Sequence, residues 1–191
     1  MINEKQLLHL MKEAYKYAGI HVSRTDVLGY DAVLLNCGFW CVMIPMQIIS
    51  GKIIGLICEW LRRMPMIGES FQFRAKEDPD PLSDGDVSGL NMLQSNTITT
   101  IPYALKPTRF RIKENRVFQR KNQDLVLIAL EHAALIENHI NLGYTNVDNS
   151  IALWESAETE ERVYIAPRRD VSPAEIAHLQ KYNFWEERDH E

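Results

Sequence analysis

Residues 29–45 read GYDAVLLNCGFWCVMIP, two apolar runs joined by a short glycine-containing link. Residues 29–36 and 39–45 are rich in aliphatic, aromatic and β-branched side chains, and a link of this length between such runs is typical of a β-hairpin. Pro45 ends the second run because proline has no N–H group to donate to a strand partner. We expect both strands to be largely buried.

Amphipathic helices are expected on both sides of this hairpin. Over residues 4–18 the apolar side chains recur at helical spacing, with Asn3 as the start signal and Gly19 as the stop signal. Residues 50–64 show the same spacing and end before a proline. The sequence therefore predicts the order helix, hairpin, helix for the opening third of the chain, followed by a short strand at 70–73.

The apolar stretch 39–61 is about long enough to cross a bilayer. Lys52 and Glu59 interrupt it, and their spacing places both on one helical face, where each charge would be costly inside a membrane. We therefore expect a buried strand, a turn and an amphipathic helix, and no membrane span.

Residues 76–96 carry aspartate, proline and glycine at a density that neither a helix nor a strand ladder tolerates. The expectation is a long acidic loop or an insertion. Loops of this length are uncommon unless they are functional or disordered.

The second half of the chain favours further strands. Residues 108–113 alternate polar and apolar side chains, and 116–120 can pair with them. Residues 125–139 favour a helix, although Leu125–Ile128 fits a central strand equally well. Two more strands are expected at 150–154 and 162–166, joined by an acidic connection. A last helix is expected from Ser172, because the sequence there fits a capping box with proline at the first helical position.

These elements predict an α+β fold in which helices pack on a mainly antiparallel sheet. The chain has 191 residues, of which 46% are hydrophobic and 25% charged, as in ordinary globular proteins. We expect one domain over residues 1–191. Cys37, Cys41 and Cys58 form no C-x-x-C pair, and the polar N-terminus lacks the layout of a secretory signal, so the expected location is the cytoplasm.

No catalytic motif stands out. The sequence contains no G-x-S-x-G, no G-x-x-x-x-G-K and no G-x-G-x-x-G. His132 and His139 lack a third convergent ligand, and the aspartates of the acidic loop miss the calcium-loop spacing. We expect no catalytic residue, metal or cofactor. An enzyme whose site converges only in the fold, around Cys37, His132 or His139, stays an alternative.

A run of basic residues is the strongest functional feature. The formal net charge of the chain is −5, yet between residues 106 and 121 only Glu114 opposes a set of cations. A strand face of this kind fits an acidic protein surface or a phosphate backbone, and it also fits a plain solvated face balanced by the acids of 155–161. The acidic segments themselves offer the opposite possibility, imitation of nucleic-acid charge. The candidate binding residues are Lys106, Arg109, Arg111, Lys113, Arg116, Arg120 and Lys121.

The segments YAGI (17–20), GYDAVLL (29–35) and GKIIGLICEW (51–60) resemble small accessory proteins carried by phages and mobile elements. Within that population the chain is similar in kind to anti-CRISPR inhibitors of type II effector nucleases. The resemblance covers about the first third of the chain and carries over no site residues. It implies a stoichiometric inhibitor that binds an effector nuclease or its guide-RNA complex.

The leading hypothesis is therefore a non-enzymatic binding protein that inhibits a protein or ribonucleoprotein effector, such as a CRISPR nuclease, through the basic strand. The alternative is direct nucleic-acid binding by the same strand, with Tyr103 or Phe118 as stacking groups. The oligomeric state is open.

Overall fold

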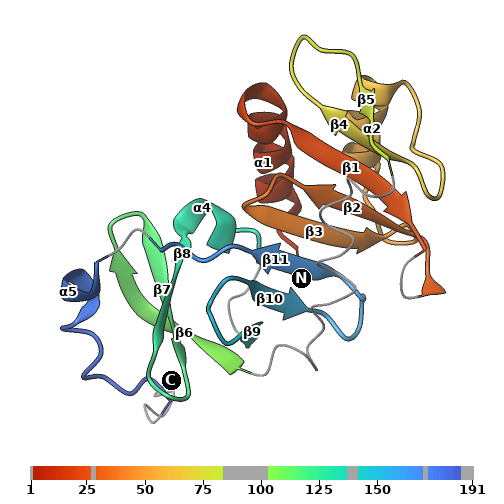
Figure 1. Ribbon diagram of the computed structural model, residues 1–191. Helices are drawn as coiled ribbons and strands as arrows, with labels where there is room; N and C mark the ends of the chain where they lie inside the picture. The colour runs from red at the N-terminus through yellow and green to blue at the C-terminus, as the bar shows by residue number, and fades with distance from the viewer. Residues whose placement is uncertain (1, 27–28, 84–102, 137–141, 170–171, 186–191) are drawn as a thin grey trace.

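The computed structural model describes residues 2–26, 29–83, 103–136, 142–169 and 172–185. The described strands form one antiparallel sheet in the order β5-β4-β1-β2-β3-β11-β10-β9-β6-β7-β8 (Figure 1). The predicted combination of helices with a mainly antiparallel sheet is confirmed.

The helices are α1 (Glu4–Tyr17), α2 (Gly51–Leu61), α4 (Leu130–Ala133) and α5 (Pro173–Ile176). The strands are β1 (Ile20–Thr25), β2 (Ala32–Asn36), β3 (Trp40–Pro45), β4 (Ser70–Phe73), β5 (Asp80–Pro81), β6 (Tyr103–Ile112), β7 (Asn115–Arg120), β8 (Leu125–Ala129), β9 (Gly143–Thr145), β10 (Ala152–Glu155) and β11 (Arg162–Ile165).

The predicted helix, hairpin and helix of the opening third are confirmed. The Asn3 side chain accepts a hydrogen bond from the Gln6 N–H at 3.2 Å, and Gly19 has a φ of 90° directly after α1. β2 and β3 pair from Ala32↔Pro45 to Asn36↔Cys41. The apolar stretch 39–61 is divided between β3 and α2. Among the described residues, no helix has the length and apolar character needed to cross a membrane.

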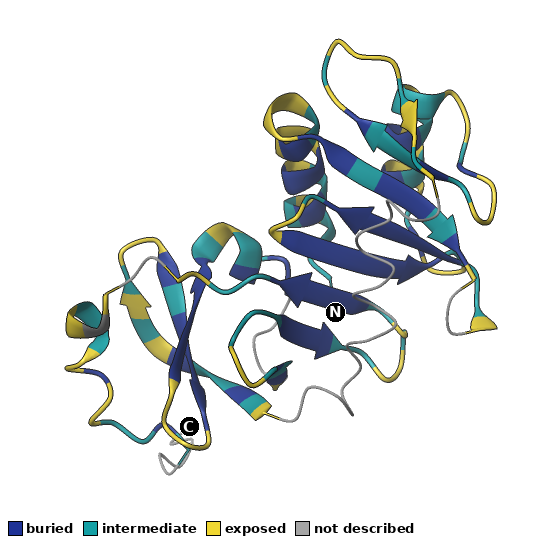
Figure 2. Ribbon diagram, viewed as in Figure 1, coloured by how far each residue is buried: buried dark blue, intermediate teal, exposed yellow. Residues whose placement is uncertain are grey.

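One face of the sheet is covered by α1 and α2. Leu7 and Met11 of α1 and Ile57 of α2 are fully buried in the same cluster as the side chains of β2 and β3 that point to this face. The rings of Tyr15 and Trp60 stack with centroids 4.7 Å apart, so the two helices also contact each other. Figure 2 shows the strands at the centre of the sheet as buried. Burial of apolar side chains between these layers is the main stabilising contribution.

The chain's two halves meet in the middle of the sheet. β3 pairs with β11 from Arg162↔Met43 to Ile165↔Trp40. The N-terminal segment also contacts the second half, because the Asn3 N–H donates to the Leu135 carbonyl at 2.7 Å. Strands from both halves thus belong to one sheet.

Residues 125–139 differ from the favoured prediction. They begin as strand β8, and the helix that follows, α4, spans only four residues. The alternative of a strand is correct for Leu125–Ile128, but β8 ends the sheet order and does not lie at its centre. It is nevertheless buried along its length, because its side chains pack on both sides and the Arg168 N–H donates to the Leu127 carbonyl at 2.8 Å. A continuous apolar run fits a strand buried on both faces as well as a helix.

Three short strands escaped prediction. β1 alternates apolar and polar residues after α1, and β5 and β9 have only two and three residues. β5 falls in the predicted acidic loop 76–96 and pairs with β4. The remainder of that loop, 84–96, lies outside the described residues, as does His139.

In the C-terminal half, β6, β7 and β8 follow β10 and β9 in the sheet order (Figure 1). The Phe118 ring of β7 lies edge-on to Trp154 of β10, with centroids 5.5 Å apart. The outer face of these strands is covered by α5 and the segment after it, where Leu179 is buried. The fully buried Gln119 side chain fixes that segment by donating to the Tyr182 carbonyl and accepting from the Phe184 N–H, both at 2.8 Å.

The close approach of the Trp154 ring to β9 requires a glycine at position 143. A Cβ atom there would lie 2.5 Å from Cε2 of the buried Trp154. We expect Gly143→Ala to lower the free energy of unfolding by about 3 kcal/mol, because a buried tryptophan ring has to move. Urea denaturation of the full chain measures this change.

Gly55→Ala is the matched control, because no atom lies within 4 Å of its Cβ position in α2. It should stabilise the protein by about 0.5–1 kcal/mol, as alanine favours the helix interior. Equal effects of the two substitutions would contradict the packing of Trp154 on Gly143.

Candidate binding surface on the β6–β7 hairpin

The β6–β7 hairpin carries the basic run, and the predicted alternation of β6 holds from Arg109 to Ile112. Arg109 and Arg111 are exposed, while Phe110 and Ile112 are half-buried against the cluster around Leu179. The register of β6 shifts between Pro107 and Arg111, and such a bulge adjusts the direction in which the strand's side chains point. Arg109 and Arg111 thus lie on the exposed side of β6.

Two guanidinium groups lie side by side across the hairpin. Arg111 pairs directly with Arg116 in the strand register. Within the described part of the chain neither has a carboxylate partner, and the Arg116 Nε is buried without a hydrogen bond. Desolvation lowers the pKa of Arg116, and the charge of Arg111 lowers it further. Like charges directly opposite in a sheet are destabilising, so this arginine pair is a local excess of positive charge.

The lysines of the run have different surroundings. Lys113, in the two-residue turn of the hairpin, forms an ion pair with Glu175 of α5. Lys121 lies with its Nζ 5.7 Å from the centroid of the Trp185 ring. Lys106 is half-buried and pairs in register with Gln119, on the face covered by the C-terminal segment.

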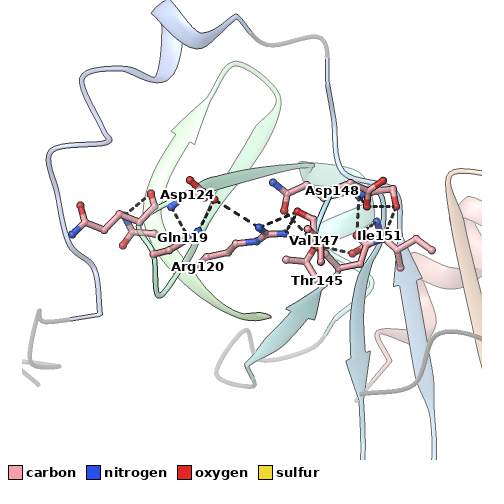
Figure 3. Close-up of polar contacts among 12 residues, drawn as sticks. Gln119, Arg120, Asp124, Thr145, Val147, Asp148 and Ile151 are labelled. Atoms are coloured by element: carbon pink, nitrogen blue, oxygen red, sulfur yellow. Dashed lines mark hydrogen bonds and ion pairs between the residues drawn. The ribbon is translucent and has the colours of Figure 1, made fainter. Parts of the chain in front are cut away.

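Arg120 is not a surface residue, which corrects the sequence-based assignment. Only 4% of it is exposed, and its guanidinium donates to the backbone carbonyls of Asn146 and Val147 in the β9–β10 loop (Figure 3). Asp124 lies 3.7 Å away, and the Tyr103 ring centroid lies 4.5 Å from the guanidinium carbon. Desolvation lowers the pKa of Arg120. Arg120 therefore fastens a loop and is not accessible to a partner.

The predicted stacking groups are also occupied. Phe118 is 1% exposed and packs on Trp154. Tyr103 is partly exposed, with the Arg120 guanidinium over its ring. Phe118 is therefore not accessible to a nucleobase, and the Tyr103 ring is already contacted by Arg120.

The candidate nucleophile has no sign of activation. Burial raises the pKa of the Cys37 thiol and lowers the pKa of His132, whose ring stacks on Phe39 with centroids 6.5 Å apart. At neutral pH the thiol is protonated and the imidazole neutral, whereas a catalytic cysteine needs a lowered pKa. The described residues contain no group of three or more potential metal ligands among histidine, cysteine, aspartate and glutamate.

A cleft of about 630 Å³ opens beside the tip of the hairpin. It is bounded by the turn between β6 and β7, by the junction of β8 with α4, and by Arg168 after β11. Asn115, at the start of β7, lines it and is 7% exposed. Sequence analysis missed Asn115 and Arg168 because 53 positions separate them, and only the closure of β8 against the segment after β11 brings them together.

No protein-family model, curated protein or solved structure matches the chain. The charges, burial and contacts of the described residues are therefore the basis for a functional proposal. They single out the arginine pair and the neighbouring cleft.

Measurements of stability can distinguish the structural role of Arg120 from the exposed position of Arg111. Arg120→Met should lower the free energy of unfolding by about 1–3 kcal/mol, because the Asn146 and Val147 carbonyl groups lose the buried guanidinium that donates to them. Arg111→Met should change it by less than about 0.5 kcal/mol, since that side chain is exposed and faces a like charge. Thermal and urea unfolding of both variants test this, and an equal loss in the two would contradict the different burial.

Acidification should destabilise the protein by protonating the half-buried imidazole of His132. The pKa of His132 in the folded protein is lowered below its unfolded-state pKa, which is near 6.5. The contribution of neutral His132 to the free energy of unfolding is therefore complete above the unfolded-state pKa. It is lost as pH falls from that pKa toward the folded-state pKa. Urea unfolding between about pH 8 and about pH 5.5 should show a smaller decrease for His132→Gln than for the unmodified chain. Parallel pH curves would mean that His132 has an ordinary pKa in the folded protein.

Proposed function

We propose that this protein is a non-enzymatic binding protein that uses Arg111 and Arg116 to bind an acidic surface of a nucleic-acid-handling effector and inhibits it stoichiometrically. The observation that carries the proposal is the arginine pair with no acidic partner in the described chain. A carboxylate placed between two guanidinium groups replaces their repulsion with charge-assisted hydrogen bonds. Binding would thus relieve an electrostatic cost that the free protein carries.

The surroundings of the pair favour a protein over bare nucleic acid. Glu114 and Glu131 line the neighbouring cleft, and Glu175 is paired with Lys113 at the hairpin tip. Duplex DNA carries about one charge per 1.7 Å and is bound by extended sets of cations. A cationic spot flanked by carboxylates fits an isolated acidic side chain better than a continuous row of phosphates. A nuclease effector as the partner is supported by the resemblance of residues 17–20, 29–35 and 51–60.

Charge reversal at Arg111 should separate binding from folding. Arg111→Glu places a carboxylate opposite Arg116, so an internal ion pair replaces the repulsion and occupies the binding group. The variant should be at least as stable as the unmodified chain, and its affinity for the partner should fall by about tenfold or more, the order of one charge-assisted hydrogen-bonded contact.

The measurement is affinity capture from nuclease-treated and untreated bacterial lysate with quantitative mass spectrometry, followed by titration of the purified captured protein and an assay of its activity. Lys12→Glu is the control, since it makes the same charge change on the exposed face of α1. The proposal requires a captured protein that survives nuclease treatment, is lost with Arg111→Glu, is retained with Lys12→Glu and is inhibited at one equivalent. Capture that depends on nucleic acid, or that ignores Arg111→Glu, would refute it.

A further inference from the structure

The C-terminal segment, residues 173–185, covers the outer face of β6, β7 and β8 without joining the sheet (Figure 1). Its described backbone–backbone hydrogen bonds are local, for example from the Leu179 N–H to the Ile176 carbonyl and from the Tyr182 N–H to the Leu179 carbonyl. In the described chain none of its backbone groups pairs with a backbone group of a strand. The segment is therefore held on the sheet by contacts that involve side chains.

A single buried glutamine binds the main chain of this segment. Gln119 Nε2 donates to the Tyr182 carbonyl, and Gln119 Oε1 accepts from the Phe184 N–H, both at 2.8 Å. The other described hydrogen bond of this carboxamide is a longer one, 3.4 Å, to the Gln123 carbonyl. Gln119 is fully buried, and buried carboxamides require hydrogen-bonding partners. This position on β7 is therefore satisfied by an extended main chain that lies on the outer face.

Apolar side chains of the segment pack on the face around that glutamine. The Tyr182 and Phe184 rings both lie against Phe110, with centroids 5.8 Å and 5.4 Å away. Leu179 is buried in one cluster with Val117. Proteins bind extended peptides by combining main-chain hydrogen bonds, which give affinity, with contacts to alternate side chains, which give specificity. The outer face offers both kinds of contact.

The segment has few connections that would tie its release to unfolding of the whole chain. Besides Gln119, its described polar partners on the sheet are Lys113 and Lys121, both at exposed positions. Exposed charge contacts contribute little to stability. The apolar cluster of this face is also separate from the one between the sheet and the helices α1 and α2. Segments with few backbone hydrogen bonds to their surroundings open locally, at a lower free energy than global unfolding.

We propose that the outer face of β6, β7 and β8 is a docking site for an extended peptide of a protein partner, and that residues 173–185 occupy it as an intramolecular competitor. The peptide has two aromatic residues at alternate positions, like Tyr182 and Phe184, with its main chain on Gln119. The inference does not rest on the proposed function. Gln119 points to the opposite face of β7 from Arg116, so the docking site and the arginine pair are separate.

Amide hydrogen exchange of the full chain, followed by NMR, tests the opening of the segment. The Phe184 N–H is bonded to buried Gln119, so it exchanges only when the segment leaves the face. We expect it to exchange at least tenfold faster than the amides of β3, at a rate that low urea concentrations leave unchanged. Equal rates with the same urea dependence would make the segment a permanent part of the core and would overturn the inference.

Binding of a fluorescent synthetic peptide with the sequence of residues 173–185 tests the docking site. The apparent affinity of a site falls with the fraction of molecules in which it is open. Phe184→Ala removes a buried ring from the intramolecular competitor, so this full-length variant should bind the peptide at least tenfold more tightly than the unmodified chain. Adding Gln119→Leu should then weaken binding about tenfold, the order of one hydrogen-bonded contact, whereas adding Lys12→Glu on α1 should not.

A peptide with alanine in place of both aromatic residues is the matched control and should not bind. Urea unfolding checks that Phe184→Ala is folded, and Tyr182→Ala, at a half-buried position, is the milder variant for the same experiment. Equal affinity for the unmodified chain and both variants, or binding that ignores Gln119 and the aromatic residues, would show that no such site exists. Exchange of the segment between two copies in a dimer, without binding of the free peptide, would overturn the inference in favour of self-association.

Discussion

Everything described for this molecule depends on the pairing of β3 with β11. Four register pairs, from Arg162↔Met43 to Ile165↔Trp40, join strands that are more than a hundred residues apart in sequence. Without this ladder the N-terminal strands would end at an exposed β3 edge, and the C-terminal strands would end at β11. Both edges carry buried apolar side chains, and unpaired edges of that kind promote aggregation. The ladder also sets where the segment after β11 runs, and hence where Arg168 meets β8 and completes the cleft.

Local patterns in the sequence account for the elements whose neighbours lie close in the chain. The β2–β3 hairpin needs only its two apolar runs and the glycine-containing link, and α1 and α2 need only their own periodicity and caps. β8 could not be assigned in the same way, because Leu125–Ile128 is apolar at every position and its burial on both faces comes from the C-terminal segment and from Arg168. β9 is three residues long, too short to show a pattern, and its Gly143 lies directly against the Trp154 ring.

Local sequence patterns also predict the candidate surface only in part. Alternation within 108–113 was sufficient to place Arg109 and Arg111 on one side and Phe110 on the other. Nothing local distinguished Arg120 from Arg116, which are both on β7 and share a strand face. The difference arises because the β9–β10 loop covers one end of that face and offers carbonyl groups to Arg120, while Arg116 lies near the hairpin tip opposite another arginine. The basic run therefore contains one arginine that stabilises the fold, Arg120, and one arginine pair, Arg111 and Arg116, that has no carboxylate partner in the described chain.

This difference between Arg120 and the arginine pair is the reason for assigning a function to the pair. The terminal nitrogens of Arg120 donate to loop carbonyl groups and Asp124 lies nearby, so the fold itself supplies acceptors for this guanidinium, although its Nε is buried without a partner. Arg111 and Arg116 repel each other and Arg116 is also partly desolvated, so an aliphatic residue at position 116 would remove both costs without disturbing the register, which is formed by the backbone. Sites where a chain carries an avoidable electrostatic cost are expected to be functional, because folding alone gives no reason to retain them.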